Sequence, residues 1–163
     1  MSSLITSARQ RTERVFAQLD WLAPLLARVT LGVLFMSTGW GKVHNLERVA
    51  AFFAELHIPA PAFQATVVAY VELIGGGLIL IGLFARIAAL PLMVSMAVAI
   101  LTAKLDEVHG FADLFGLVEW TYFALLAWVA LAGPGRVSLD QLVFSRRGSG
   151  AAHQRTTADS EAV

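Results

Sequence analysis

Four long apolar segments, each bounded by polar or charged residues, dominate the pattern along this chain. They cover residues 22–41, 63–83, 87–105 and 117–132. A bilayer core about 30 Å thick needs about 20 apolar residues as helix, so the pattern predicts four spans, the fourth of them the shortest. Barrel strands would be shorter and would alternate apolar with polar residues, which these segments do not. We therefore predict an all-α integral membrane four-helix bundle.

The segments outside the spans predict little buried structure. Residues 1–20 mix apolar positions with Arg and Gln, which favours a short amphipathic helix at the membrane interface or plain disorder. The tail 145–163 is rich in Gly, Ala, Ser and Thr and is expected to be disordered. Between the first two spans, residues 43–62 predict a short outer helix that stops near Pro59. The membrane domain is accordingly placed at residues 21–144.

Composition supports a membrane protein and limits its chemistry. Of the 163 residues, 57% are hydrophobic and 15% are charged, a balance that soluble domains do not show. No nucleotide-binding loop or haem motif is present, and we expect no nucleic-acid partner. The chain has no cysteine. Sulfur-based electron transfer would therefore need a partner or a bound cofactor.

The distribution of Lys and Arg predicts the orientation. Basic residues precede the first span, occupy the second connection at Arg86 and follow the fourth span. The other side has fewer basic residues, and these are mixed with acidic ones. The positive-inside rule then places both termini in the cytoplasm, as an even number of spans requires.

Two charged residues lie within the apolar segments, Arg28 in the first and Glu72 in the second. Ionisable side chains inside a membrane are costly, usually face the bundle interior and often mark a functional path. One hypothesis is a structural salt bridge between Arg28 and Glu72. The alternative is that Glu72 receives or passes a proton beside a quinone-sized pocket. We take this pair as the candidate catalytic residues.

Glycines share helix faces with these charges. On the first span, Arg28, Gly32, Phe35, Gly39 and Lys42 lie on one stripe. On the second span, Gly75 and Gly76 share the face of Glu72. Small residues let membrane helices approach closely, so we assign these four glycines to helix packing. The same faces are compatible with a homo-oligomer.

A second polar group gathers at the outward ends of the helices. Long side chains there can simply extend to the interface, or they can form a mouth that meets an anionic substrate or a quinone head group. The histidines lack the spacing of a metal site, so no metal is predicted. The candidate substrate- or quinone-binding residues are Lys42, Trp40, His44, Lys104, His109 and Glu119.

The order and spacing of several features resemble the DoxX family. The resemblance covers about residues 26–142. It rests on Arg28 with Gly32, Phe35, Gly39 and Lys42, on Phe53 to Pro59, on Glu72 with Gly75 to Gly77, on Gly82 with Arg86, and on the closing Gly133, Pro134, Gly135, Ser138, Leu139 and Asp140. It implies a bacterial inner-membrane protein with four helices, related to the DoxD subunit of thiosulfate:quinone oxidoreductase and to membrane partners of thiol-handling enzymes.

Together, the residues and the resemblance predict a membrane subunit of an oxidoreductase system. Such a subunit would contact the lipid bilayer, a protein redox partner and the quinone pool; the residues do not identify a cofactor, and quinone is the candidate. One alternative is a non-catalytic membrane anchor or assembly factor for a partner enzyme. A small-solute transporter is a further alternative, although four short unbroken spans offer little for alternating access.

Overall fold

The computed structural model describes Leu19, residues 21–133, Gly135 and residues 138–140. These residues form helices and connections and contain no strand, which confirms the all-α class. The N-terminal segment up to residue 18 and the tail 145–163, for which an interfacial helix and disorder were predicted, lie outside the described residues. The elements are α2 (Leu22–Val43), α3 (Leu46–Glu55), α4 (Pro61–Ile81), α5 (Ala85–Ala103), η1 (Leu105–Glu107), α6 (Phe111–Gly116) and α7 (Val118–Ala132).

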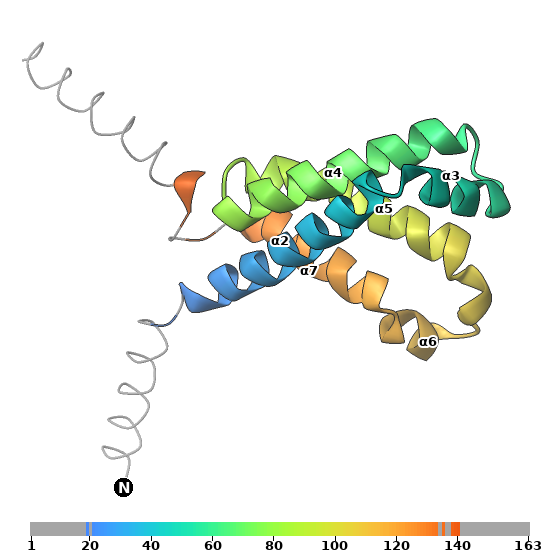
Figure 1. The fold of residues 1–163 in the computed structure, drawn as a ribbon. Coiled ribbons are helices and arrows are strands. Elements are labelled where there is room, and N and C mark those ends of the chain that lie inside the picture. Colours follow the sequence, from blue (N-terminus) through green and yellow to red (C-terminus); the bar gives the residue numbers. More distant parts are fainter. Residues whose placement is uncertain (1–18, 20, 134, 136–137, 141–163) are drawn as a thin grey trace, which may run out of the picture.

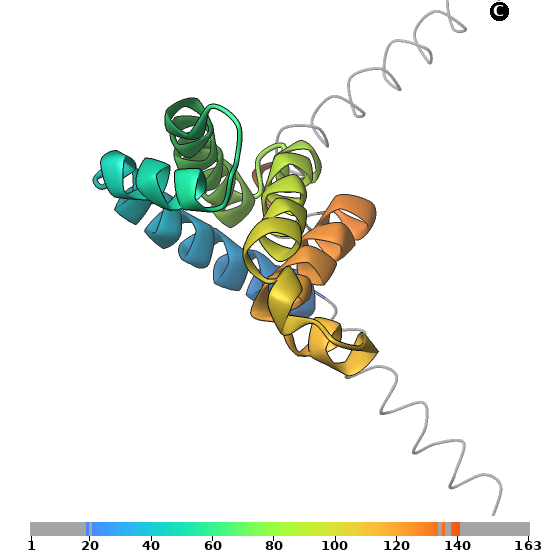
Figure 2. The same ribbon diagram turned by 90° about the vertical axis from the view of Figure 1, so that its right-hand side faces the viewer.

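Three of these helices, α2, α4 and α5, are long and apolar enough to cross a membrane. The fourth apolar helix, α7, has 15 residues, which corresponds to about 22 Å of helix. It packs along α5 and completes the membrane helical bundle. Figure 2 shows α5 lying between α4 on one side and α7 on the other.

The most extensive helix contact joins α2 and α4, which run antiparallel (Figure 1). Glycines at the contact let the two backbones approach closely. Gly32 lies against Leu80, and Gly39 lies against Leu73. An ideal Cβ on Gly39 would stand 2.3 Å from the backbone nitrogen of Leu73. From Gly32 to Gly39 the chain advances seven residues on α2, while the contacted residue on α4 moves back by seven, from Leu80 to Leu73. This antiparallel register determines which polar groups of the two helices can meet.

The turn between α4 and α5 is closed by local hydrogen bonds. Gly82 has φ +70°, and the bonds from its N–H and that of Leu83 to the carbonyls of Ile79 and Leu78 form a Schellman motif. Asp140, which follows α7 in the chain, makes two hydrogen bonds to this turn. Its carboxylate accepts the N–H of Phe84 at 2.9 Å, and its own N–H donates to the Gly82 carbonyl at 3.0 Å.

The tightly packed core lies toward this turn. It draws on α2, α4, α5 and α7 and comprises Leu31, Phe35, Ile79, Ala85, Ala88, Ala89, Leu92, Leu126 and Val129. The other end of the bundle is packed less closely, since Ile100 is the one buried residue in the second half of α5. There α3 contacts α4, and no residue of α3 itself is fully buried. The bundle is therefore closed at one end and looser at the other.

The connection from α3 to α4 turns sharply. His57 and Ala60 both adopt positive φ, at 56° and 50°. Pro61 then begins α4, at a helix position where its missing N–H costs nothing. The predicted outer helix is thus present, and the turn returns the chain so that α3 lies along the first half of α4.

Candidate functional site

Glu72 is the buried acidic residue at the looser end of the bundle. It is 1% exposed, and its oxygen Oε1 accepts a hydrogen bond and ion pair from the ammonium of Lys42. Lys42 lies in the last turn of α2, and its side chain remains 30% exposed. The α2–α4 register brings these two residues together, since Gly39 on α2 already contacts Leu73 on α4.

Arg28, expected to pair with Glu72, lies at the other end of the bundle. Its guanidinium lies close beside Gly82 and Ser138, and the nearby Asp140 carboxylate contributes a favourable charge. Gly82 follows Glu72 by ten residues, which is about 15 Å along the helix. The expected pair is therefore replaced by Lys42–Glu72. The reason is axial register: both cations lie on the predicted face of α2, but Lys42 is the one level with Glu72.

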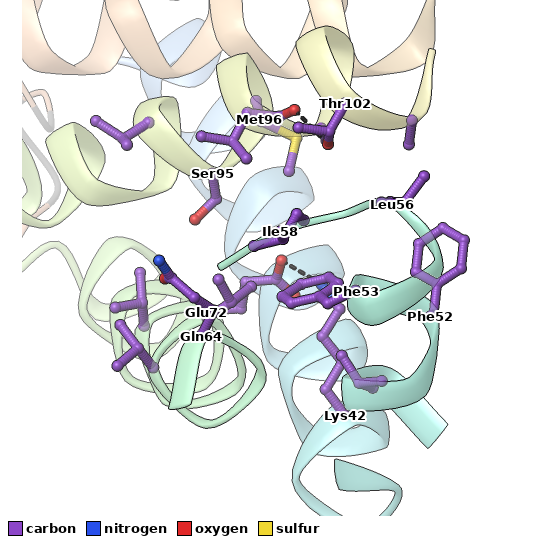
Figure 3. A pocket seen from close by; sticks show the side chains of 18 of the residues that line it. Lys42, Phe52, Phe53, Leu56, Ile58, Gln64, Glu72, Ser95, Met96 and Thr102 are labelled. Atoms are coloured by element: carbon purple, nitrogen blue, oxygen red, sulfur yellow. Dashed lines mark hydrogen bonds and ion pairs between the residues drawn. The ribbon is translucent and has the colours of Figure 1, made fainter. Parts of the chain in front are cut away.

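A cavity of about 610 Å³ opens beside Glu72 (Figure 3). Its walls come from the end of α2, from α3 and the following turn, from α4 between Gln64 and Glu72, and from α5 between Pro91 and Ala103. The lining residues are Lys42, Arg48, Val49, Phe52, Phe53, Leu56, Ile58, Gln64, Val67, Val68, Val71, Glu72, Pro91, Val94, Ser95, Met96, Val98, Ala99, Thr102 and Ala103. Volume and lining match those of small-molecule sites, which are mostly apolar with a few polar groups.

The cavity is elongated and reaches the apolar surface of the bundle. Along α5 it extends from Pro91 to Ala103, twelve residues or about 18 Å. Three of its lining valines, Val67, Val94 and Val98, are 39%, 63% and 43% exposed. These side chains belong to α4 and α5, two helices long and apolar enough to cross a membrane, so this part of the cavity wall reaches the apolar surface of the bundle.

Sequence reasoning missed two hydroxyl groups in the α5 wall. Ser95 Oγ donates to the Pro91 carbonyl at 3.2 Å, and Thr102 Oγ1 donates to the Val98 carbonyl at 2.8 Å. Their oxygen lone pairs therefore remain as acceptors in the cavity wall. A signal was present, because the two residues are seven apart and hence on one face of an otherwise apolar helix.

The aromatic wall from α3 was also missed. Phe53 lies beside the Lys42–Glu72 pair in Figure 3, with Ile58 from the following turn nearby. The rings of Phe52 and Phe53 have centroids 6.3 Å apart. Because α3 contributes Val49, Phe52 and Phe53 to the cavity wall, with Arg48 as its polar lining residue, it serves as the cover of the site.

The four packing glycines have their space filled by neighbouring helices. Gly75 lies against Leu92 of α5, and an added Cβ on Gly76 would stand 2.6 Å from the Met36 nitrogen. Next to Glu72, these glycines therefore pack against α5 and α2. The cavity lies instead toward the start of α4, at Gln64 and the valines that follow it.

Most of the predicted outer cluster does not line the cavity. Trp40 packs against His44, with ring centroids 4.3 Å apart, and Trp40 is 61% exposed. Lys104 binds Glu107 at 2.7 Å, a hydrogen bond that raises the pKa of Lys104. The remaining two candidates lie near α6 and α7. The backbone N–H of His109 donates to the Asp113 carboxylate, and Glu119 lies in the first turn of α7. Among the described residues, no group of His, Asp and Glu is arranged to hold a metal.

One known protein family matches the part of the chain that forms the cavity. The DoxX family model matches residues 23–105, which is more than half of the chain. The chain belongs to the DoxX family. The matched DoxX region runs from α2 to just beyond α5 and contains every residue that lines the cavity.

Individual DoxX relatives cover most of the chain. The protein named "Putative oxidoreductase CatD" of Bacillus subtilis is 34% identical over 131 residues, covering 79% of this chain and 92% of that protein. "Uncharacterized membrane protein Rv3486" of Mycobacterium tuberculosis is 34% identical over 73% of this chain and 80% of its own length. "Inner membrane protein YqjF" of Escherichia coli is 28% identical over 77% of this chain and 95% of that protein. No solved structure gives a significant match.

Proposed function

We propose that this chain is the quinone-binding membrane subunit of an oxidoreductase system. The observation that carries the proposal is the cavity between α3, α4 and α5, which combines an apolar wall that reaches the bundle surface with an ion pair between the partly exposed Lys42 and the buried Glu72. A redox lipid with an aromatic head and a long apolar tail suits such a site, because the head needs polar partners and the tail needs contact with the bilayer. The printed name of the Bacillus subtilis relative supports an oxidoreductase role.

In this proposal each lining residue has a role that follows from the chemistry of its side chain. Lys42 is a hydrogen-bond donor at the polar end of the cavity, and Glu72 is an acceptor that can take up or release a proton. Phe53 provides an aromatic surface against which the head group can pack. A bound quinone supplies the two-electron chemistry. Arg28 is left out of the proposed site, since its guanidinium lies beside Gly82 at the opposite end of the bundle.

The placement in the membrane is part of the proposal. The excess of Arg on the side of the α4–α5 turn puts both termini in the cytoplasm. The cavity then lies in the outer half of the bilayer, and the bundle is a multi-pass protein of the inner membrane, as the name of the Escherichia coli relative indicates for that protein. Electrons would reach the site from a protein redox partner.

Quinone content measured with matched cavity variants tests the proposal. The protein is purified in a mild detergent, and extracted quinone and copurifying proteins are quantified by mass spectrometry. Ala99→Trp fills the cavity from α5. Leu101→Trp is the matched control, because Leu101 lies two residues further on the same helix, is 63% exposed and does not line the cavity. Thermal unfolding of each variant checks that the bundle is intact.

The expected result is about one quinone per chain in the unmodified protein and in Leu101→Trp, with loss of quinone in Ala99→Trp. Equal quinone in all three proteins would show that it is carried by detergent and lipid, and the proposal would be abandoned. A redox enzyme that copurifies without any quinone would favour the anchor or assembly role instead.

A further inference from the structure

One residue of the cavity wall, Glu72, has a buried acceptor oxygen that lacks a donor. Oxygen Oε1 of Glu72 is bound by Lys42, whereas Oε2 is buried and has no hydrogen-bond partner in the described part of the chain. A carboxylate oxygen withdrawn from water and left without a donor bears the full cost of its desolvation. Glu72 also lines the cavity. A ligand that presents a donor to this carboxylate would remove that cost.

The other polar groups of the wall do not supply this donor, and neither does the Arg48 guanidinium of α3, since Glu72 Oε2 has no hydrogen-bond partner among the described residues. The hydroxyl hydrogens of Ser95 and Thr102 are used by carbonyl groups of α5 itself. Gln64 lies eight residues before Glu72 on α4, which is about 12 Å away along the helix. The Lys42 ammonium has three N–H groups, so it can serve Glu72 and still donate to a ligand oxygen beside it. The polar end of the cavity thus offers a donor and an acceptor side by side.

We infer that the cavity binds the reduced, dihydroxy form of an aromatic redox lipid, a quinol, in preference to the oxidised dicarbonyl form. The inference rests on the proposed function and specifies which form of the ligand the site recognises. A quinol hydroxyl is donor and acceptor at once: its O–H meets Glu72 Oε2, and its oxygen accepts from Lys42. The second hydroxyl, or the ring substituents, can face the acceptor oxygens on α5.

The oxidised form fits this pattern less well. Its carbonyl oxygens accept hydrogen bonds and cannot donate them. The oxidised form could accept a hydrogen bond from Lys42, but Glu72 Oε2 would remain buried without a donor, because the chain itself supplies none in its described part. Hydrogen bonds to charged groups are stronger than those between neutral groups. The difference of one such bond predicts a preference of about tenfold or more for the quinol.

A direct binding comparison tests this preference in the unmodified protein. The full chain is reconstituted in lipid nanodiscs under anaerobic conditions, and dissociation constants are measured by titration calorimetry. The three probes are decylubiquinol, decylubiquinone and the dimethyl ether of decylubiquinol, in which both donors are blocked. We expect the quinol to bind about tenfold more tightly than each of the other two.

Two matched variants locate the preference at Glu72. In Glu72→Gln the buried acceptor loses its charge and gains an amide donor, so the ratio between quinone and quinol affinities should fall below about threefold. Glu107→Gln makes the same chemical change at an exposed glutamate outside the cavity and should keep the tenfold ratio. Circular dichroism of both variants verifies that the helices are retained.

The outcomes separate the inference from the proposed function. Quinone binding as tightly as quinol, or ether binding as tightly as quinol, would overturn the preference while leaving a quinone site in place. An unchanged ratio in Glu72→Gln would likewise refute the role of this carboxylate. If none of the three probes binds the unmodified protein, the proposed function fails and the inference fails with it.

Discussion

Removing Lys42 should destabilise the bundle because it leaves the Glu72 carboxylate buried without its counter-charge. In Lys42→Met the chain retains a similar apolar stem but loses the ammonium. The Glu72 side chain is 2% exposed, so water cannot take over the lost interaction. Breaking a fully buried ion pair from one side costs about 3–5 kcal/mol. Because the Lys42 side chain is 30% exposed, we expect the lower part of that range or slightly less.

The partial exposure of the lysine sets the size of the expected loss. Lys42→Met should lower the free energy of unfolding by about 2–3.5 kcal/mol. Glu72→Gln alone should cost only about 1 kcal/mol, since the partly exposed lysine can extend to the interface.

The double variant provides the decisive comparison. With both Lys42→Met and Glu72→Gln in place, no buried charge remains, and the stability should recover to within about 1 kcal/mol of the unmodified protein. Unfolding is followed by circular dichroism in mixed micelles at pH 7 as the fraction of denaturing detergent rises. Lys104→Met is the matched control, because Lys104 pairs with an exposed glutamate and should show no change. A destabilised Lys42→Met that the second substitution fails to rescue would refute the reasoning.

Three further changes test the packing that positions the site. Gly39→Ala places a methyl group against the α4 backbone and should lower the free energy of unfolding by about 1–3 kcal/mol. Gly41→Ala is the matched control: an added methyl group there has no atom within 4 Å, so the free energy of unfolding should stay the same or rise slightly in the same assay. Asp140→Ala removes the acceptor for the Phe84 N–H and should cost about 0.5–2 kcal/mol; Asp140→Asn, which keeps an acceptor, should cost less, and equal losses would contradict this. Gly82→Ala forces a side chain into φ +70° beside the Arg28 guanidinium and should lower the unfolding midpoint by more than Asp140→Asn does.

Several properties of this protein were predictable from local patterns because they depend on one helix at a time. Long apolar segments must be helical in a bilayer, where each backbone polar group needs a partner within the chain. A charge such as Glu72 in such a segment must face protein. The glycines of α2 and α4 indicated which faces would meet, because small residues permit close backbone approach. The helix class, the contact faces and the burial of Glu72 followed from these rules.

The partner of Glu72 and the shape of the site depended on the tertiary structure. Periodicity identifies the face of a helix but not its axial position against a neighbour, so Arg28 and Lys42 looked equivalent along one stripe. Packing of Gly32 and Gly39 against α4 sets that position and selects Lys42. The cavity is likewise a space left between α3, α4 and α5, and no single segment encodes it. The sequence alone thus determined a membrane bundle with a buried charge, and packing among the helices decided what that charge meets.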